Sequence, residues 1–130
     1  MSKLNKEEII KIAALMIHAS KLDEHFTEKE KKLVINFVKN NCSENSDELN
    51  IFQEAEKLEN NTNQLLNYTN IIKQKSLEIK KDIIAHLWKV IISDNTVDQY
   101  ESNLMRRICG LIYFPDKESA EIKLQIMNNK

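Results

Sequence analysis

Residues 22–30 read Leu-Asp-Glu-His-Phe-Thr-Glu-Lys-Glu, and residues 93–101 read Ser-Asp-Asn-Thr-Val-Asp-Gln-Tyr-Glu. Each stretch lies between two apolar helical patterns and carries Asp at its second place, an apolar residue at its fifth, Thr or Asp at its sixth and Glu at its ninth. The same number of residues separates Asp23 from Asp94, Met16 from Leu87 and Phe37 from Ile108. A shared pattern at a constant offset predicts two pseudo-symmetric helix-turn-helix units.

The composition of the 130-residue chain favours helices throughout. The chain contains one glycine, Gly110, and one proline, Pro115, whereas antiparallel sheets need turns rich in these residues at short intervals. A chain of this length can bury a core without disulfides or structural metal. We therefore expect an all-α fold, a compact bundle of six or seven helices that forms a single domain over residues 1–130.

Apolar spacing and capping residues place these helices along the chain. The longest apolar pattern follows Ser76 and predicts a central helix. The apolar stripes of the two middle helices are the least regular, and they include Leu49 and Leu66. The predicted helices begin at or just after Asn5, Thr27, Ser46, Asn63, Ser76, Asp98 and Pro115.

Four residues of the duplicated stretches match a helix-capping pattern. Thr27 and Glu30 are spaced as a capping box, and so are Asp98 and Glu101. In such a box the first side chain accepts a hydrogen bond from a free helix amide, while the Glu reaches back to the amide of the first residue. Capping alone accounts for these four residues.

Capping does not require Asp23 or Asp94, which come four positions before each cap. A carboxylate that follows a helix lies at the unfavourable end of the helix dipole, at a cost of a few tenths to about 1 kcal/mol, so another partner is expected. One interpretation is an Asx-turn, in which the side chain bonds its own backbone. The other is a bound cation. The residues of the turns are compatible with both interpretations.

An ion bound at these turns would meet only oxygen ligands, which suit a hard divalent cation such as Ca²⁺, Mg²⁺ or Mn²⁺. The turns are not EF-hands, because the span from the first Asp to the Glu is too short for the EF-hand loop and lacks the required glycine. The predicted metal ligands are Asp23, Glu30, Asp94, Asp98 and Glu101.

The repeated Asp-x-x-apolar-Thr/Asp-x-x-Glu turn resembles the TerB-like family of tellurite-resistance and stress-response domains. Leu87-Trp88-Lys89-Val90 before the second copy and Met105-Arg106-Arg107-Ile108 after it carry the same resemblance, which covers nearly the whole chain. It implies an all-helical fold with internal pseudo-symmetry and acidic turns proposed to bind metal. Similar domains occur in J-domain cochaperones related to DjlA. Glu24 and Asn95 stand where the family usually has Gly.

Charge and motifs argue against several other classes. The net charge is −1 and the basic residues are scattered, so neither nucleic acid nor an anionic membrane is an expected partner. No apolar run approaches the ~20 residues that cross a bilayer, and the N-terminus lacks an apolar signal core. We therefore expect a cytoplasmic protein that does not span a membrane. Cys42 and Cys109 should accordingly be reduced thiols.

Enzyme motifs are also missing. The chain has no Gly-rich phosphate loop and no His-Glu-x-x-His pair, and His18 and His86 lie in helical patterns where structural imidazoles are common. Two hypotheses follow. The first is a non-catalytic stress-response or envelope-associated adaptor, in which a divalent cation at the acidic turns biases docking to a partner protein, including a membrane-associated one. The alternative is a metal-independent, cochaperone-like helical module for protein–protein interaction.

Overall fold

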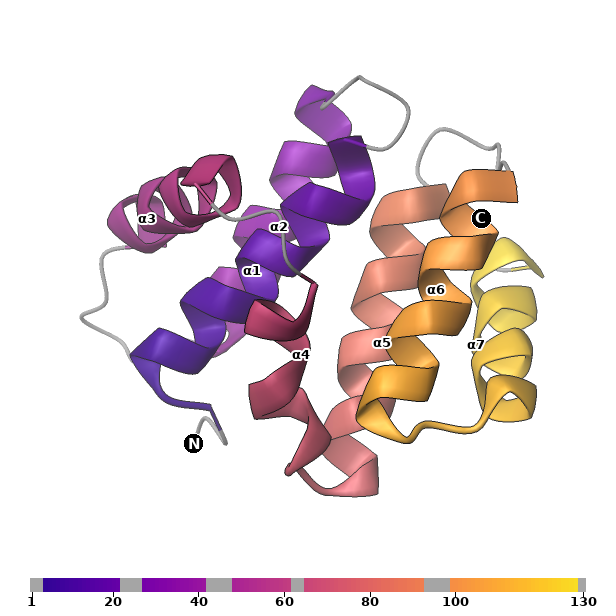
Figure 1. Ribbon diagram of the computed structural model, residues 1–130. Coiled ribbons are helices and arrows are strands. Elements are labelled where there is room, and N and C mark those ends of the chain that lie inside the picture. The colour runs from indigo at the N-terminus through magenta and orange to yellow at the C-terminus, as the bar shows by residue number, and fades with distance from the viewer. Residues whose placement is uncertain (1–3, 22–26, 42–47, 62–64, 93–98, 129–130) are drawn as a thin grey trace.

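The computed structural model describes residues 4–21, 27–41, 48–61, 65–92 and 99–128, and all regular structure in these ranges is helical (Figure 1). The α-helices of these ranges are α1 (Lys6–Ser20), α2 (Glu28–Asn41), α3 (Glu48–Asn61), α4 (Leu66–Lys73), α5 (Leu77–Ile92), α6 (Gln99–Ile112) and α7 (Asp116–Asn128). The predicted all-α class is confirmed. No described helix combines the length and the apolar character needed to cross a bilayer.

The helix boundaries reproduce the offset that relates the two acidic stretches. The same offset carries the first residue of α1 onto the first residue of α5, and both ends of α2 onto both ends of α6. The N-terminal caps also correspond: Asn5 Oδ1 accepts from the Glu8 N–H at 2.8 Å, and Ser76 Oγ accepts from the Ile79 N–H at 3.3 Å. Asn5 and Glu8 form a complete capping box, because the Asn5 N–H donates to Glu8 Oε1 at 2.9 Å.

α1 is the most enclosed helix. The consecutive side chains of 12–17 are fully buried, and a helix that is apolar all round must be covered on every side. α1 packs against α2, α3, α4 and α5, whereas α5 packs against α1, α2 and α7. α5, the helix predicted to be central after Ser76, buries a wide face and contacts α1, α2 and α7, while α1 is the more enclosed of the two helices.

α4 and α5 connect two groups of helices. α1, α2 and α3 pack on one another, and α7 packs on α5 and α6. α4 lies against both α1 and α6, and α5 also lies against α1 and α2. Figure 1 shows α4 between the two groups, with α3 and α7 on the outside of their respective halves. The apolar core runs through both groups, from Leu15 and Phe37 to Leu87 and Ile108.

Two apolar residues of the middle helices are exposed, contrary to prediction. Leu49 is 61% exposed and Leu66 is 50% exposed. Each stands two positions before the first buried residue of its helix, Ile51 in α3 and Tyr68 in α4. Two positions turn an α-helix by about 200°, so each Leu points away from the core.

The end of α6 forms a Schellman motif whose left-handed position holds Tyr113 and not glycine. The Phe114 N–H donates to the Cys109 carbonyl at 2.8 Å, and the Tyr113 N–H donates more weakly to the Gly110 carbonyl at 3.4 Å. Tyr113 has a φ of 59°, in the left-handed region that favours glycine. The one glycine of the chain lies inside α6 instead, and Pro115 directly precedes α7.

Replacing Tyr113 should expose the cost of this backbone conformation. Tyr113→Gly and Tyr113→Ala both remove the ring, which lies under Lys73 Nζ at 5.4 Å, so their difference isolates the backbone. We expect the Gly variant to be more stable than the Ala variant by about 1 kcal/mol. Urea unfolding of both variants measures this difference, and an Ala variant of equal or greater stability would contradict the left-handed cap.

Candidate functional site

The first duplicated turn leads into a closed capping box at the start of α2. The Thr27 N–H donates to Glu30 Oε1 at 2.8 Å, and the Glu30 N–H donates to Thr27 Oγ1 at 3.1 Å. The Thr27 hydroxyl lies 3.1 Å from the same carboxylate oxygen. The predicted box at Thr27 and Glu30 is therefore confirmed.

The Glu at the end of each duplicated stretch is buried. Glu30 is 1% exposed, and its counterpart Glu101, in the first turn of α6, is 3% exposed. Burial of a carboxylate is costly unless it is hydrogen-bonded or paired, so a single buried Glu would already be unusual. Two buried Glu residues at equivalent places indicate that α2 and α6 each begin around an enclosed carboxylate.

The other predicted metal ligands lie outside the described residues. These are Asp23, Asp94 and Asp98, and with them the second capping box and the geometry of both acidic turns. Within the ranges that the structure describes, no group of three or more His, Cys, Asp or Glu side chains is placed to hold a metal ion. Of the predicted ligands, the structure thus places Glu30 and Glu101, one at the start of each equivalent helix.

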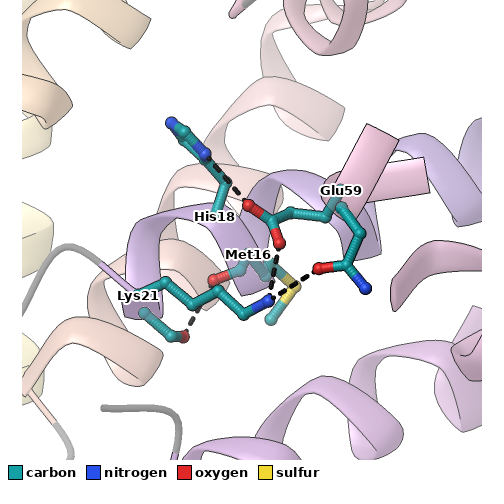
Figure 2. Close-up of polar contacts among 6 residues, drawn as sticks. Met16, His18, Lys21 and Glu59 are labelled. Atoms are coloured by element: carbon teal, nitrogen blue, oxygen red, sulfur yellow. Dashed lines mark hydrogen bonds and ion pairs between the residues drawn. The ribbon is translucent and has the colours of Figure 1, made fainter. Parts of the chain in front are cut away.

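A further buried carboxylate, Glu59, ties the end of α3 to the end of α1 (Figure 2). The Lys21 ammonium donates to Glu59 Oε1 at 2.8 Å and to Asn60 Oδ1 at 3.2 Å. His18 Nδ1 lies 3.4 Å from Glu59 Oε2. Both carboxylate oxygens therefore have a partner from α1 or its C-cap residue, which offsets the cost of burying the charge. Lys21 is also the residue directly before the first acidic turn.

Tyr68 of α4 lies next to this cluster, with its ring centroid 6.2 Å from that of His18. Burial raises the pKa of the Tyr68 phenol above its ordinary value, and the charge of Glu59 raises it further. Both causes disfavour the phenolate. The cluster therefore keeps a neutral Tyr beside a buried carboxylate.

Sequence reasoning missed Glu59, although a signal was present. Glu59 stands in a polar run with Asn60 and Asn61 that predicts a helix end. Its spacing from Phe52 and Ala55 is helical, and those two residues belong to the buried face of α3. Extending that face by one turn places Glu59 against α1.

The two helical histidines have structural partners, as predicted. His18 pairs with Glu59. His86 Nδ1 lies 2.8 Å from the Asp82 carbonyl oxygen, and because a carbonyl only accepts, this nitrogen carries a proton. The His86 ring also meets Phe37 edge-on, with centroids 5.1 Å apart.

Cys109 is a free and buried thiol. Burial raises its pKa, a hydrogen bond with Ser119 opposes that rise, and the charge of Asp116 adds to it. A raised pKa leaves little thiolate at neutral pH, and the thiolate is the reactive form. The free, buried thiol of Cys109 thus agrees with the prediction of a reduced cysteine, while Cys42 lies outside the described residues.

Comparison with known proteins identifies one family. A sequence model of the family described as "Tellurite resistance protein TerB" matches residues 9–124. No curated protein and no solved structure matches the chain significantly. The matched span includes both duplicated turns, the whole of α2 to α6, and most of α1 and α7.

Removing the Thr27 side chain should destabilise the fold independently of ions. Thr27→Ala removes the hydroxyl that caps α2 and contacts the enclosed Glu30 carboxylate, so we expect a loss of about 1–2 kcal/mol in the free energy of unfolding. Thr27→Ser keeps the hydroxyl and should lose much less. Urea unfolding with chelator and with excess Ca²⁺ or Mg²⁺ measures both variants. A loss for Thr27→Ala that appears only with ions would refute the structural role.

The Tyr68 phenol should report the charge of Glu59. Glu59→Gln should lower the pKa of Tyr68 but leave it above the ordinary value, because burial is the larger cause of the shift. Glu54→Gln, which removes an exposed charge from the same helix, should have no effect. The measurement is a pH titration of isotope-labelled Tyr by NMR, and an equal response to both substitutions would contradict a specific effect of Glu59.

Stability at alkaline pH should follow the same shift. A folded-state pKa above that of the unfolded chain stabilises the fold fully at pH values below the ordinary Tyr pKa of about 10. This contribution is lost as the pH rises through the folded-state pKa. Tyr68→Phe should therefore flatten the alkaline fall of the free energy of unfolding, and an unchanged slope would contradict the assignment.

Proposed function

The chain belongs to the TerB family of tellurite resistance proteins, and we propose that it is a non-catalytic stress-response adaptor whose duplicated acidic turns bind a divalent cation. The proposed ligands are Asp23 and Glu30 at the first turn and Asp94, Asp98 and Glu101 at the second. Ca²⁺, Mg²⁺ and Mn²⁺ suit such oxygen ligands. The cation biases docking to a protein partner, including one associated with the cell envelope.

The observation that carries the proposal is the equivalent burial of Glu30 and Glu101. At the first turn the enclosed carboxylate follows a second acidic residue, Asp23, seven positions earlier in the sequence. The amides at the start of α2 stabilise part of this negative charge. A cation would balance the rest, because like charges that share a site disfavour one another.

The contacts of Lys21 suggest how an ion at the first turn would act on the rest of the molecule. The turn joins α1 to α2, and Lys21, its immediate neighbour, is held by Glu59 and Asn60 of α3. A change at the turn therefore acts directly on the junction of these three helices. The surface formed by α2 and α3 is the part of the first unit whose position would respond.

The second candidate is a metal-independent helical interaction module of the cochaperone type. The closed box at Thr27 and Glu30 favours it, since the hydrogen bonds of the box already stabilise the carboxylate without an ion. In this function the acidic turns only start helices, and partner binding relies on an exposed helix surface.

Thermal melts separate the two functions. Asp23→Asn and Asp94→Asn keep side-chain size and turn-forming ability but remove one charge each. Without ions these variants should be as stable as the wild type or slightly more stable. A bound ion stabilises the native state by RT ln(1 + [L]/Kd), or about 2.7 kcal/mol at a concentration of 100 Kd. The wild type should show this gain with Ca²⁺, Mg²⁺ or Mn²⁺, and the Asn variants should lose most of it.

Glu54→Gln serves as the matched control, since it removes an exposed carboxylate from α3. This variant should keep the full gain on addition of ions. If the wild type gains no more than the Asp23→Asn and Asp94→Asn variants with any of the three ions, the cation is rejected and the metal-independent module is favoured.

A further inference from the structure

One side of α6 is exposed to solvent and carries no acidic residue. The acidic residue of α6, Glu101, is enclosed, and nine positions separate it from Gly110, which is half a turn beyond two full turns of the helix. Positions three or four apart share one helix face. The exposed residues of this face and of the end of α6 are Asn103, Arg106, Arg107, Gly110 and Tyr113.

Gly110 leaves the middle of this face without a side chain. Apart from its own stretch of helix, a Cβ added at Gly110 would meet no described heavy atom within 4 Å. A glycine inside a helix destabilises the helix relative to alanine. Because the space is open, packing within the fold does not require glycine at this position. Close approach of another chain does require the absence of a side chain.

Tyr113, one turn after Gly110, is also placed unfavourably for stability. It is 69% exposed, more than any other large apolar side chain in the described ranges. Its φ of 59° lies in the region that favours glycine. Residues held in unfavourable backbone conformations cluster at binding sites, and tyrosine and arginine are enriched in protein–protein interfaces. The arrangement of Gly110 and Tyr113 therefore indicates a binding surface.

The charges around Gly110 and Tyr113 are mainly positive. Arg106 and Arg107 are exposed one turn before Gly110, and Lys73 of α4 places its Nζ 5.4 Å from the centroid of the Tyr113 ring. Within the ranges that the structure describes, no ion pair engages either arginine. Asp116 of α7 borders the surface beside Arg106. Three positive charges against one negative charge leave the surface net positive, although the whole chain has a net charge of −1.

We propose that this surface, formed by Lys73, Arg106, Arg107, Gly110 and Tyr113, is a docking site for an acidic segment of a partner protein. Carboxylates of the segment pair with the arginines, whose planar guanidinium groups can bind a carboxylate through two hydrogen bonds. The main chain of the segment lies against Gly110, and one of its apolar side chains packs on the Tyr113 ring.

A protein segment fits this surface better than an anionic membrane does. A lipid surface gives no reason for a glycine at the centre of the face, and a chain of net charge −1 is not drawn as a whole to anionic lipid. The surface contains none of the proposed metal ligands. Docking here therefore requires the partner of the proposed function but not its cation.

A library of random displayed peptides, selected on the immobilised full chain in the presence of chelator, tests the surface. We expect the selected peptides to be enriched in Asp and Glu relative to the library, because charge complementarity favours them. The tightest-binding peptide is then synthesised, and its site is mapped by NMR from the shifts of backbone amides. The largest shifts should fall near Lys73 and from Arg106 to Tyr113. Vesicles of phosphatidylcholine and phosphatidylserine should not bind the chain.

Gly110→Gln separates docking from stability. Glutamine is a better helix former than glycine, so the melting temperature should rise by about 2–5 °C. The added side chain blocks close approach, so the synthesised peptide should bind at least about tenfold more weakly. Tyr113→Gly removes the ring but suits the left-handed backbone, and a similar loss of affinity is expected. A residue with only a structural role would not combine higher stability with weaker binding.

Matched charge variants test the role of the arginines. Arg106→Gln and Arg107→Gln each remove one exposed positive charge from the surface, and the peptide should bind each variant at least about fivefold more weakly. Lys57→Gln is the control, since it removes an exposed positive charge from α3, in the other half of the molecule. This control should change the affinity by less than about twofold.

Four outcomes would overturn the proposal. The first is a set of selected peptides without enrichment in acidic residues or with a site elsewhere on the chain. The second is unchanged affinity in Gly110→Gln. The third is an equal loss of affinity in Lys57→Gln and Arg106→Gln, which would indicate diffuse attraction. The fourth is binding to the anionic vesicles, which would identify a lipid surface as the partner. Thermal melts that reject the cation would leave all four results unaffected, because the selection and titrations contain chelator.

Discussion

The fold depends on the enclosure of residues 12–17 of α1. Its residues 12–17 have no contact with solvent, so α2, α3, α4 and α5 must cover it on all sides. Where α1 leaves the core, its polar groups need partners inside the protein. Ser20 Oγ donates to the Met16 carbonyl at 2.9 Å, and Lys21 reaches Glu59 of α3. The cluster in Figure 2 is thus a consequence of ending the buried part of α1 with polar residues that need partners inside the protein.

The enclosed carboxylates of Glu30 and Glu101 are the second constraint on the fold. Each follows a duplicated acidic turn and stands in the first turn of an equivalent helix. A helix N-terminus stabilises negative charge, and at α2 the Thr27 amide and hydroxyl add hydrogen bonds. A Glu at this place can therefore be buried at low cost. The same arrangement would also present a pre-oriented acidic group to an ion in the preceding turn.

Repetition and capping made much of this fold predictable from sequence. The constant offset between the two acidic stretches established the equivalence of α2 and α6, and the Thr27 and Glu30 spacing identified a box that the structure contains. The helical spacing of apolar residues did not predict which residues are buried where the buried face of a helix depends on the helix packed against it. Leu49 reads as part of an apolar stripe but points to solvent, whereas Glu59 reads as a helix end but faces α1. Neither environment can be inferred from α3 alone.

The two helix-turn-helix units have equivalent helices but expose different side chains to solvent. At the offset that relates the two units, Arg106 corresponds to Ile35, which packs against the core, and Trp88 corresponds to the fully buried Ile17. α3 packs on both α1 and α2, while α7 packs mainly on α5. Both units therefore bury their apolar residues, Trp88 included, but the second unit has an open groove with charged lining residues between α6 and α7. Both units have an enclosed carboxylate, but the side chains between their paired helices differ. The second unit therefore has a basic surface, which the equivalent positions of the first unit cannot form.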